Sequence, residues 1–258
     1  MQKKATQLFS FSKTAGILDK PKDLAVCYIV GAGEVNSLPF KITSKDFIIA
    51  ADGGMDICLK YNIPVNLWIG DMDSAKQTNG QIDIITIHLS PQKDQTDTYA
   101  AVEIALQKGY KNICIYGGLG GSYRHTIANI QTLAFIAKSG GRGYLVNEKE
   151  VLTVINNEEV FFAKTHKGHL SVFALDGQAT GVDLKNLKYP LNNAVLEDIY
   201  PKGVSNGFIK KVASPLPRLQ GGLFCTTNMA VDNNFYGIEK PATVKVGDGS
   251  LLLVYEVL

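Results

Sequence analysis

The chain has 258 residues, which is enough for one large or two modest domains. It is 45% hydrophobic and 19% charged, with 25 Gly and 9 Pro, a globular balance that excludes wholesale disorder, collagen and coiled coil. Its 26 Lys and Arg nearly balance 24 Asp and Glu, which is too even for a dedicated nucleic-acid or membrane-surface protein. The four cysteines lie in apolar segments without a CxxC pair, so we expect buried, reduced thiols and a cytoplasmic protein: Cys27, Cys58, Cys114 and Cys225.

The first 150 residues alternate short apolar runs with segments of helical periodicity. The apolar runs predict buried strands at residues 24–30, 47–51, 67–69, 82–89, 113–116 and 144–146. Apolar residues at helical spacing predict helices at 55–61, 96–108 and 125–138. This alternation is typical of a parallel α/β sheet that is covered on both faces.

Beyond residue 150 the pattern changes to strand, turn, strand. Apolar runs occupy residues 160–163, 168–174, 178–183, 242–246 and 251–257, with turns that include Asp176-Gly177, Asn206-Gly207 and Asp248-Gly249. This half predicts a small antiparallel β-sandwich or barrel. Residues 210–240 are rich in Pro, Gly and Asn and predict either a long hairpin or an inserted loop.

Five aspartates follow predicted strands of the first half: Asp52, Asp71, Asp73, Asp94 and Asp97. The carboxyl ends of parallel strands share one edge, where α/β sheets bind ligands. Asp71 and Asp73 lie in GDMDS, where two carboxylates about 4 Å apart would repel by roughly 4 kcal/mol at an effective dielectric of 20. Such a pair favours a divalent cation, and oxygen ligands suit Mg²⁺. The alternative is that these aspartates simply form turns.

Two further features point to phosphate. In KDQTD, Thr96 can cap a helix, and Lys93 supplies a cation for a phosphate group. The glycine-rich loop GGLGGSYRH at 117–125 follows a strand and opens a helix, a place where free backbone N–H groups bind anions. The GAGE loop at 31–34 lacks the third glycine of a dinucleotide fingerprint, and a tight turn explains it equally well.

Taken in order, the motifs resemble those of the thiamine pyrophosphokinase family. The segments that carry the resemblance are ADGG (51–54), IGDMDS (69–74), KDQTD (93–97), GGLGGSYRHTIAN (117–129), GVDLKNLKYPL (181–191) and GVSN (203–206). The resemblance implies an N-terminal parallel α/β, Rossmann-like nucleotide domain over residues 1–155 and a C-terminal antiparallel β-sandwich over residues 156–258.

The same resemblance implies an activity: transfer of the pyrophosphoryl group of ATP to the hydroxyl of thiamine, which gives thiamine pyrophosphate and AMP. ATP and thiamine are then the expected partners and Mg²⁺ the cofactor, with no nucleic acid and no membrane. The family works as a homodimer whose thiamine site lies at the subunit interface.

Carried over residue by residue, the family motifs imply three sets of site residues. The catalytic and Mg²⁺-binding set is Asp71, Asp73 and Asp97. The ATP-binding set is Asp52, Gly53, Gly54, Lys93, Asp94, Gly120, Gly121, Ser122 and Arg124. The thiamine-binding set is Tyr189, Ser205 and Asn206, in which Tyr189 offers an aromatic face to the cationic thiazolium.

The sequence departs from the family in two motifs. Ser122 and Arg124 stand where the family has Arg and Asp, and Gly207 stands where it has Glu. We expect the guanidinium of Arg124 to reach the phosphate oxygens in place of the lost Arg, because Arg matches phosphate geometry in a bidentate way. Two alternatives stay open: a pyrophosphokinase for a pterin-type hydroxymethyl substrate, and a catalytically inactive nucleotide- or thiamine-binding regulator.

Overall fold

The computed structural model describes residues 6–11, 18–19, 24–36, 42–71, 84–90, 92, 94–209 and 240–257. The helices are α1 (Gly54–Lys60), α2 (Asp97–Gln107) and α3 (Tyr123–Lys138). The strands up to α3 are β1 (Thr6–Gln7), β2 (Ser10–Phe11), β3 (Leu18–Asp19), β4 (Cys27–Val30), β5 (Phe47–Ala51), β6 (Leu67–Gly70), β7 (Ile85–His88) and β8 (Asn112–Tyr116). The later strands are β9 (Arg142–Val146), β10 (Glu150–Asn156), β11 (Glu159–Phe161), β12 (His169–Lys185), β13 (Leu191–Glu197), β14 (Gly203–Gly207), β15 (Thr243–Lys245) and β16 (Asp248–Glu256).

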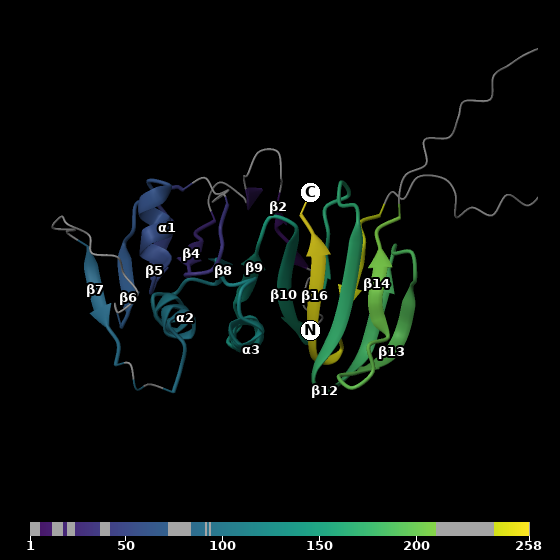
Figure 1. Cartoon of the computed structure of the whole chain (residues 1–258). Helices are drawn as coiled ribbons and strands as arrows, with labels where there is room; N and C mark the ends of the chain where they lie inside the picture. The colour runs from purple at the N-terminus through teal and green to yellow at the C-terminus, as the bar shows by residue number, and fades with distance from the viewer. Residues whose placement is uncertain are drawn as a thin grey trace, which may run out of the picture.

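The first half contains a parallel sheet in the spatial order β9-β8-β4-β5-β6-β7. The chain starts at β4 and moves outward through β5 and β6 to β7, and α2 then returns it to β8 on the other flank of β4 (Figure 1). The strand order therefore reverses between β4 and β8. Open α/β sheets bind ligands at such a switch point, outside the carboxyl ends of the strands.

Helices cover both faces of this sheet, as the sequence predicts. Alternate strand residues point to opposite faces. Ile29 and Ile49 belong to the core cluster that includes residues of α2 and α3, whereas Val30 and Ala50 pack with Met55 and other residues of α1. The near-continuous apolar runs of these strands are explained by burial on both sides.

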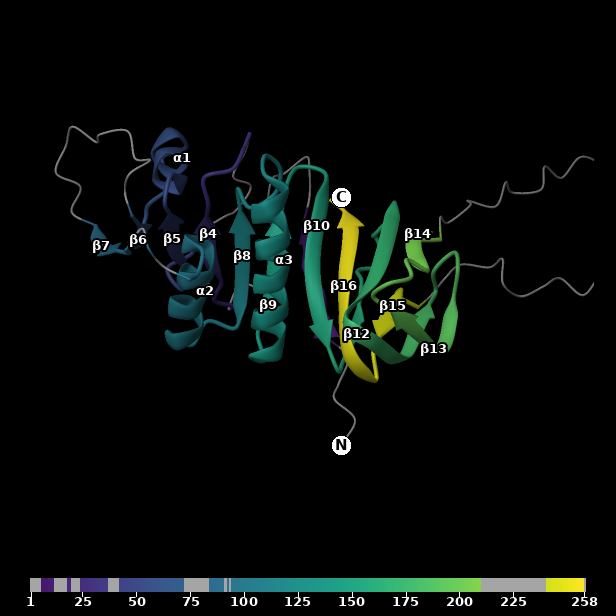
Figure 2. The ribbon, with the colours of Figure 1, turned by 60° about the horizontal axis from the view of Figure 1, so that its bottom comes forward.

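The second half is antiparallel, and its strands continue the same hydrogen-bonded sheet. β10 joins β9 to β16, and β16 pairs with β12 (Figures 1 and 2). The first part of β12 also pairs with β14, and its second part pairs with β13 and β15. In the part of the chain that the structure describes, no helix follows α3. The structure is therefore a mixed sheet whose parallel part carries the helices and whose antiparallel part follows it in the chain.

The three predicted turns all lie within strands: β12 runs through Asp176-Gly177, and Asp248-Gly249 begins β16. Asp176 and Gly177 adopt positive φ values of 64° and 91°, as a hairpin turn would require. Here they form a bulge, since the register against β16 jumps between Leu175↔Ser250 and Thr180↔Asp248. The two predicted strands at 168–174 and 178–183 are therefore one bent strand. Asn206-Gly207 likewise lies within β14 and not in a turn.

Three cysteines are buried and form no disulfide among the described residues, as predicted: Cys27, Cys58 and Cys114. Burial raises the pKa of the Cys27 and Cys58 thiols, which disfavours the reactive thiolate. Cys225 lies outside the described residues, and the cytoplasmic location stays a prediction. None of the helices described is long and apolar enough to cross a membrane.

Candidate functional site

Two glycine loops meet where the strand order reverses. Gly31 N donates to Tyr116 O at 2.8 Å, and Gly33 N donates to Gly117 O at 2.9 Å, so the loop after β4 lies directly on the loop after β8. A Cβ on Gly33 would stand 2.5 Å from Gly117 O, which no side chain can tolerate. The GAGE loop therefore needs its second glycine for the close approach of two backbones, and the tight-turn explanation of the sequence captures only part of this.

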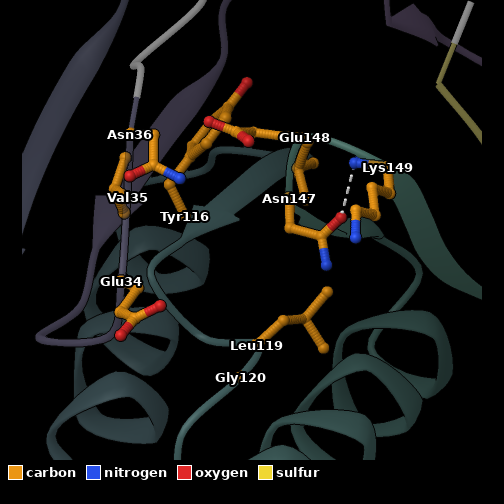
Figure 3. Close-up of a pocket in the computed structure, with 10 residues that line it drawn as sticks. Glu34, Val35, Asn36, Tyr116, Leu119, Gly120, Asn147, Glu148 and Lys149 are labelled. Carbon is orange, nitrogen blue, oxygen red and sulfur yellow. Dashed lines mark hydrogen bonds between the residues drawn. The ribbon is translucent and has the colours of Figure 1, made fainter.

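A cavity of about 280 Å³ opens beside these loops (Figure 3). Its lining comes from the segments after β4, β8 and β9 and includes the buried strand residues Tyr116 and Val146. The other lining residues are Glu34, Val35, Asn36, Leu119, Gly120, Asn147, Glu148 and Lys149. The volume is close to the lower end of the range for ligand pockets, which is about 300 Å³.

Asp52 and Asp71 follow neighbouring strands at this same edge. Asp52 directly follows β5 in the left-handed region (φ 50°), and its backbone N donates to Ile69 O at 2.7 Å. Trp68 Nε1 donates to Asp52 O at 3.1 Å. A Cβ on Gly70 would stand 3.0 Å from Asp52 Cα, so this glycine lets the ends of β5 and β6 approach each other. Asp71 comes next and is half-buried.

The start of α2 supplies the second acidic segment. Thr96 Oγ1 accepts a hydrogen bond from Tyr99 N at 3.2 Å, which confirms the predicted helix cap. Asp97 is the first helical residue and is half-buried, and Asp94 is exposed. Asp73 and Lys93 lie outside the described residues. Among those that are described, no three His, Cys, Asp or Glu side chains gather into a group able to hold a metal ion.

Among the glycines of the predicted ATP set, Gly54 is packed tightly against backbone, whereas Gly120 and Gly121 stand in open space. A Cβ on Gly54 would stand 1.8 Å from Val30 O, so this glycine lets α1 pack against β4, and Gly53 precedes the helix as its N-cap. Gly120 and Gly121 have φ values of 84° and 67° with open space around them. Of this pair, Gly120 lines the cavity.

The departing positions Ser122 and Arg124 lie at the start of α3. Ser122 is the N-cap residue, but its side chain makes no capping hydrogen bond. Arg124 is the second helical residue and is exposed. Nothing in the structure places its guanidinium on a phosphate, so its compensating role stays a prediction.

The predicted thiamine residues gather in the β half. Asn206 is buried, and its side-chain amide is used on backbone groups: Oδ1 accepts from Tyr189 N at 2.9 Å and from Gly207 N at 2.8 Å, and Nδ2 donates to Tyr189 O at 2.7 Å. The Tyr189 side chain is 56% exposed, and Lys188 Nζ lies 5.1 Å from its ring centroid. Ser205 has a φ of 60°, and its backbone N donates to Ser171 Oγ at 3.1 Å. The structure thus brings the three together, with Asn206 holding the segment that carries Tyr189.

Sequence reasoning missed the polar walls of the cavity, chiefly Glu34, Asn147 and Lys149. A signal for Asn147 was present, because it directly follows the predicted strand at 144–146 just as the aspartates follow theirs.

Comparisons with known proteins agree with this architecture. Residues 40–144 match the family described as Thiamin pyrophosphokinase, catalytic domain. A curated thiamine pyrophosphokinase of Bacillus subtilis (strain 168) is 31% identical over 174 residues, which is 64% of this chain and 81% of that protein.

Solved structures show the same fold. The crystal structure of thiamine pyrophosphokinase from Bacillus subtilis has a TM-score of 0.71 at 20% identity and covers 90% of this chain and 99% of its own. Thiamin pyrophosphokinase from Candida albicans has a TM-score of 0.64 at 13% identity and covers 100% of this chain and 96% of its own. These structures support the fold, and the curated relative supports descent. The chain belongs to the thiamine pyrophosphokinase family.

Proposed function

We propose that this protein is a thiamine pyrophosphokinase, which transfers the pyrophosphoryl group of ATP to the hydroxyl of thiamine and releases AMP. The observation that carries the proposal is the 31% identity to the Bacillus subtilis enzyme over 81% of its length. The fold agrees with it, because Asp52 and Asp71 follow neighbouring parallel strands at the edge where α/β sheets bind ligands.

The two halves of the chain would divide the substrates. In this proposal residues 1–155 form a Rossmann-like domain that binds ATP, and residues 156–258 form a β-sandwich that binds thiamine. Support for the first comes from the switch point between β4 and β8. Support for the second comes from the exposed ring of Tyr189, which can stack on a cationic thiazolium.

The acidic residues at the carboxyl edge suit Mg²⁺ by their chemistry. Mg²⁺ prefers oxygen ligands and is commonly held by one or two carboxylates together with substrate phosphates. Asp71 and Asp97, with Asp73, would hold the ion, and Asp94 would support them. Bound there, Mg²⁺ would neutralise charge on the phosphates during transfer.

The reaction itself needs mainly positioning. The hydroxyl oxygen of thiamine forms a bond to the β-phosphorus of ATP, and the bond from that phosphorus to the α–β bridging oxygen breaks, so that AMP leaves. The hydroxyl proton passes to the carboxylate of Asp71 or Asp97. Because positioning and charge neutralisation supply most of the catalysis in phosphoryl transfer, no stronger base is required.

The separation of the two predicted sites supports a homodimer. β12, which carries the partners of the thiamine-side segments, lies seven strand spacings from β6, or roughly 34 Å at the usual spacing. Figure 1 shows β6 and β13 near opposite ends of the molecule. Thiamine on Tyr189 would therefore reach the phosphates on Asp71 of a second copy more readily than those of its own chain.

Apolar side chains on the β half are available for such a contact. Large hydrophobic residues rarely gather on the surface of a monomer without a partner. Among the described residues of this half, the exposed large hydrophobic ones are Tyr189, Val195, Ile199, Tyr200, Val204 and Ile209.

The test is an assay with ATP, Mg²⁺ and thiamine that measures AMP and thiamine pyrophosphate. Asp71→Asn should lower turnover about 100-fold or more, because charge stabilisation by a metal ion contributes several kcal/mol. The matched control Asn192→Asp changes an exposed residue of β13 and should leave turnover unchanged. Near-normal turnover in Asp71→Asn would remove the acidic edge from the mechanism. A wild-type protein that binds ATP and thiamine without forming product would favour the inactive regulator.

A further inference from the structure

Lys188 places a positive charge on the aromatic face that the proposed function assigns to thiamine. It lies between β12 and β13, it is exposed, and its Nζ stands 5.1 Å from the centroid of the Tyr189 ring. Lys185, earlier in the same segment, pairs with Asp183 at 3.4 Å. Among the residues that the structure describes, no carboxylate lies within ion-pair distance of Lys188. The ammonium of Lys188 is therefore available to a ligand.

The position opposite Lys188 is a glycine, which explains the missing partner. Leu187 and Phe208 form an antiparallel bridge. The next pair along the two segments is Lys188 with Gly207, and Lys188 N donates to Gly207 O at 2.8 Å. Directly opposite residues of antiparallel segments have side chains on the same face, where opposite charges attract. The family motif has Glu at position 207, so the departure noted in the sequence removes a carboxylate from beside Lys188.

The surroundings of Gly207 leave room for a longer side chain. On its other side Gly207 pairs with His169 of β12, whose Nδ1 lies 2.5 Å from Glu256 Oε1. The same carboxylate oxygen accepts from His169 N at 3.2 Å, so Glu256 is directed toward His169. The nearest described atom to a Cβ on Gly207 is Gly168 O at 3.3 Å, a contact that a small shift relieves. A substitution at this position can therefore test the charge next to Lys188.

We propose that Lys188 sets the preference of this site between thiamine and its phosphorylated product. The inference rests on the proposed function for the identity of the two ligands. Thiamine is a cation, which the ammonium of Lys188 repels, whereas thiamine pyrophosphate adds a diphosphate that the ammonium attracts. The thiazolium replaces the ammonium on the Tyr189 ring, and the displaced ammonium, on its flexible stem, pairs with the diphosphate.

This arrangement has a consequence for turnover. A cation beside the aromatic face weakens the binding of substrate and strengthens the binding of product. Because Gly207 offers no carboxylate to neutralise Lys188, the protein should retain thiamine pyrophosphate and be inhibited by it. A chain with Glu at position 207 should release its product more readily.

The experiment measures the binding of thiamine, thiamine monophosphate and thiamine pyrophosphate to the full chain by calorimetry. Lys188→Met keeps most of the side-chain length and removes the charge. The affinity for thiamine pyrophosphate should fall at least about fivefold, because a hydrogen bond to a charged group is lost. The affinity for thiamine should rise about twofold, and that for the monophosphate should fall by an intermediate factor. Lys185→Met removes the same charge from the same segment and should change each affinity by less than about twofold.

Two substitutions at position 207 test the missing partner. Gly207→Glu gives Lys188 a carboxylate across the strand pair and should lower the affinity for thiamine pyrophosphate about fivefold, while that for thiamine rises. Gly207→Gln adds a side chain of nearly the same size without the charge. It should leave the ratio of the two affinities within about twofold of the wild-type ratio.

Three results would overturn the inference. One is an unchanged ratio of the two affinities in Lys188→Met, and another is an equal loss of both, which would make the lysine structural only. Equal effects of Gly207→Glu and Gly207→Gln would assign the change to bulk and not to charge. Failure of the proposed function looks different, since the wild type would then form no thiamine pyrophosphate from ATP and thiamine while the ratio of affinities still depended on Lys188.

Discussion

Asn206 is a buried amide that fixes the backbone of an exposed aromatic residue. The family resemblance implies that it contacts thiamine directly, but both ends of its amide bond the backbone of Tyr189. We therefore expect it to act by positioning Tyr189, with Ser205 left to offer its hydroxyl to thiamine.

Asn206→Asp tests this role. The variant keeps an acceptor for Tyr189 N but replaces the donor to Tyr189 O with a second oxygen, which should lower the free energy of unfolding by about 1–3 kcal/mol. Thiamine affinity should fall several-fold while AMP affinity stays constant, as measured by calorimetry alongside urea denaturation. Asn192→Asp is the control for the same chemical change on an exposed strand. A destabilised variant with normal thiamine affinity would show that Asn206 is structural only.

His166 predicts a pH dependence of stability. Its ring is buried and lies 4.7–5.2 Å, centroid to centroid, from the rings of Phe162, Phe208 and Tyr255. Neither ring nitrogen forms a well-aligned hydrogen bond with any of the described residues. Burial lowers the pKa of His166 from 6.5 to about 4, with a smaller opposing effect from the backbone of Glu256. Lys164 and Lys240 line the same small cavity and add positive charge near the ring.

Because the folded state holds this histidine neutral, the unfolded state binds more protons between pH 6.5 and pH 4. The neutral, buried His166 therefore does not lower the free energy of unfolding above pH 6.5. As the pH falls toward 4, protonation of this histidine in the unfolded state lowers the free energy of unfolding by up to about 3 kcal/mol. His166→Phe should flatten the fall in unfolding free energy across this window. Denaturation at pH 7, 6, 5 and 4 measures it, and equal slopes for the variant and the wild type would assign the acid sensitivity to other groups.

At the scale of elements, the contact between the two glycine loops fixes the switch point. Gly117 has a φ of 67°, and a Cβ on it would stand 2.5 Å from Gly31 O. Gly140 has a similar φ of 73° with nothing within 4 Å of its Cβ position, so it is a matched control.

Gly140→Ala should carry only the backbone strain, about 1–2 kcal/mol of unfolding free energy. Gly117→Ala adds the clash and should lose clearly more, together with AMP binding, because the end of β8 must move away from β4. Chemical denaturation and calorimetry compare the two variants. Equal losses of unfolding free energy in the two variants would mean that the two glycine loops can move apart without destabilising the protein.

The sequence predicts the parallel strands well because burial on both faces leaves continuous apolar runs, and β5 has the predicted bounds. It predicts the antiparallel half less well. β13 reads LNNAVLE and β14 reads GVSNG, and in both strands polar residues break up the apolar ones because one face of each strand is exposed. The Asp176-Gly177 bulge has the residues of a turn, and only the partner strand β16 shows that the chain continues.

At the scale of the whole molecule, the strand order sets the distance between the two candidate sites, the acidic edge at Asp71 and the thiamine-side segment at Tyr189. Sequence motifs identify Asp71 and Tyr189 but give no distance between them, since distance follows from strand order. The cavity is likewise a product of three loops that are remote in sequence, the segments around residues 34, 119 and 147. No single motif contains it, which is why its polar walls were missed.

Subunit mixing tests the proposed shared site. At low thiamine concentration, we expect the Asp71→Asn variant to be nearly inactive and the Tyr189→Ala variant to have low activity. In a two-fold dimer with its site between subunits, a mixed dimer contains one site with both defects and one with neither. Unfolding and refolding the variants together should restore about a quarter of wild-type activity, because about half of the dimers are mixed. No gain over the separate variants would place each site within one chain.

β16 is synthesised after both strands that it joins. The ribosome releases β10 and β12 before Asp248–Glu256, yet β16 lies between them and pairs with each. Until those residues emerge, both neighbours present an unpaired row of backbone groups to other chains in the cell. The sheet neighbours of β4, β5, β6 and β8 all precede residue 248 in the chain. A nascent chain that stalls before residue 248 should therefore contain a formed parallel sheet, while the edges of β10 and β12 that pair with β16 stay unpaired. Such a chain should depend on chaperones until β16 is added.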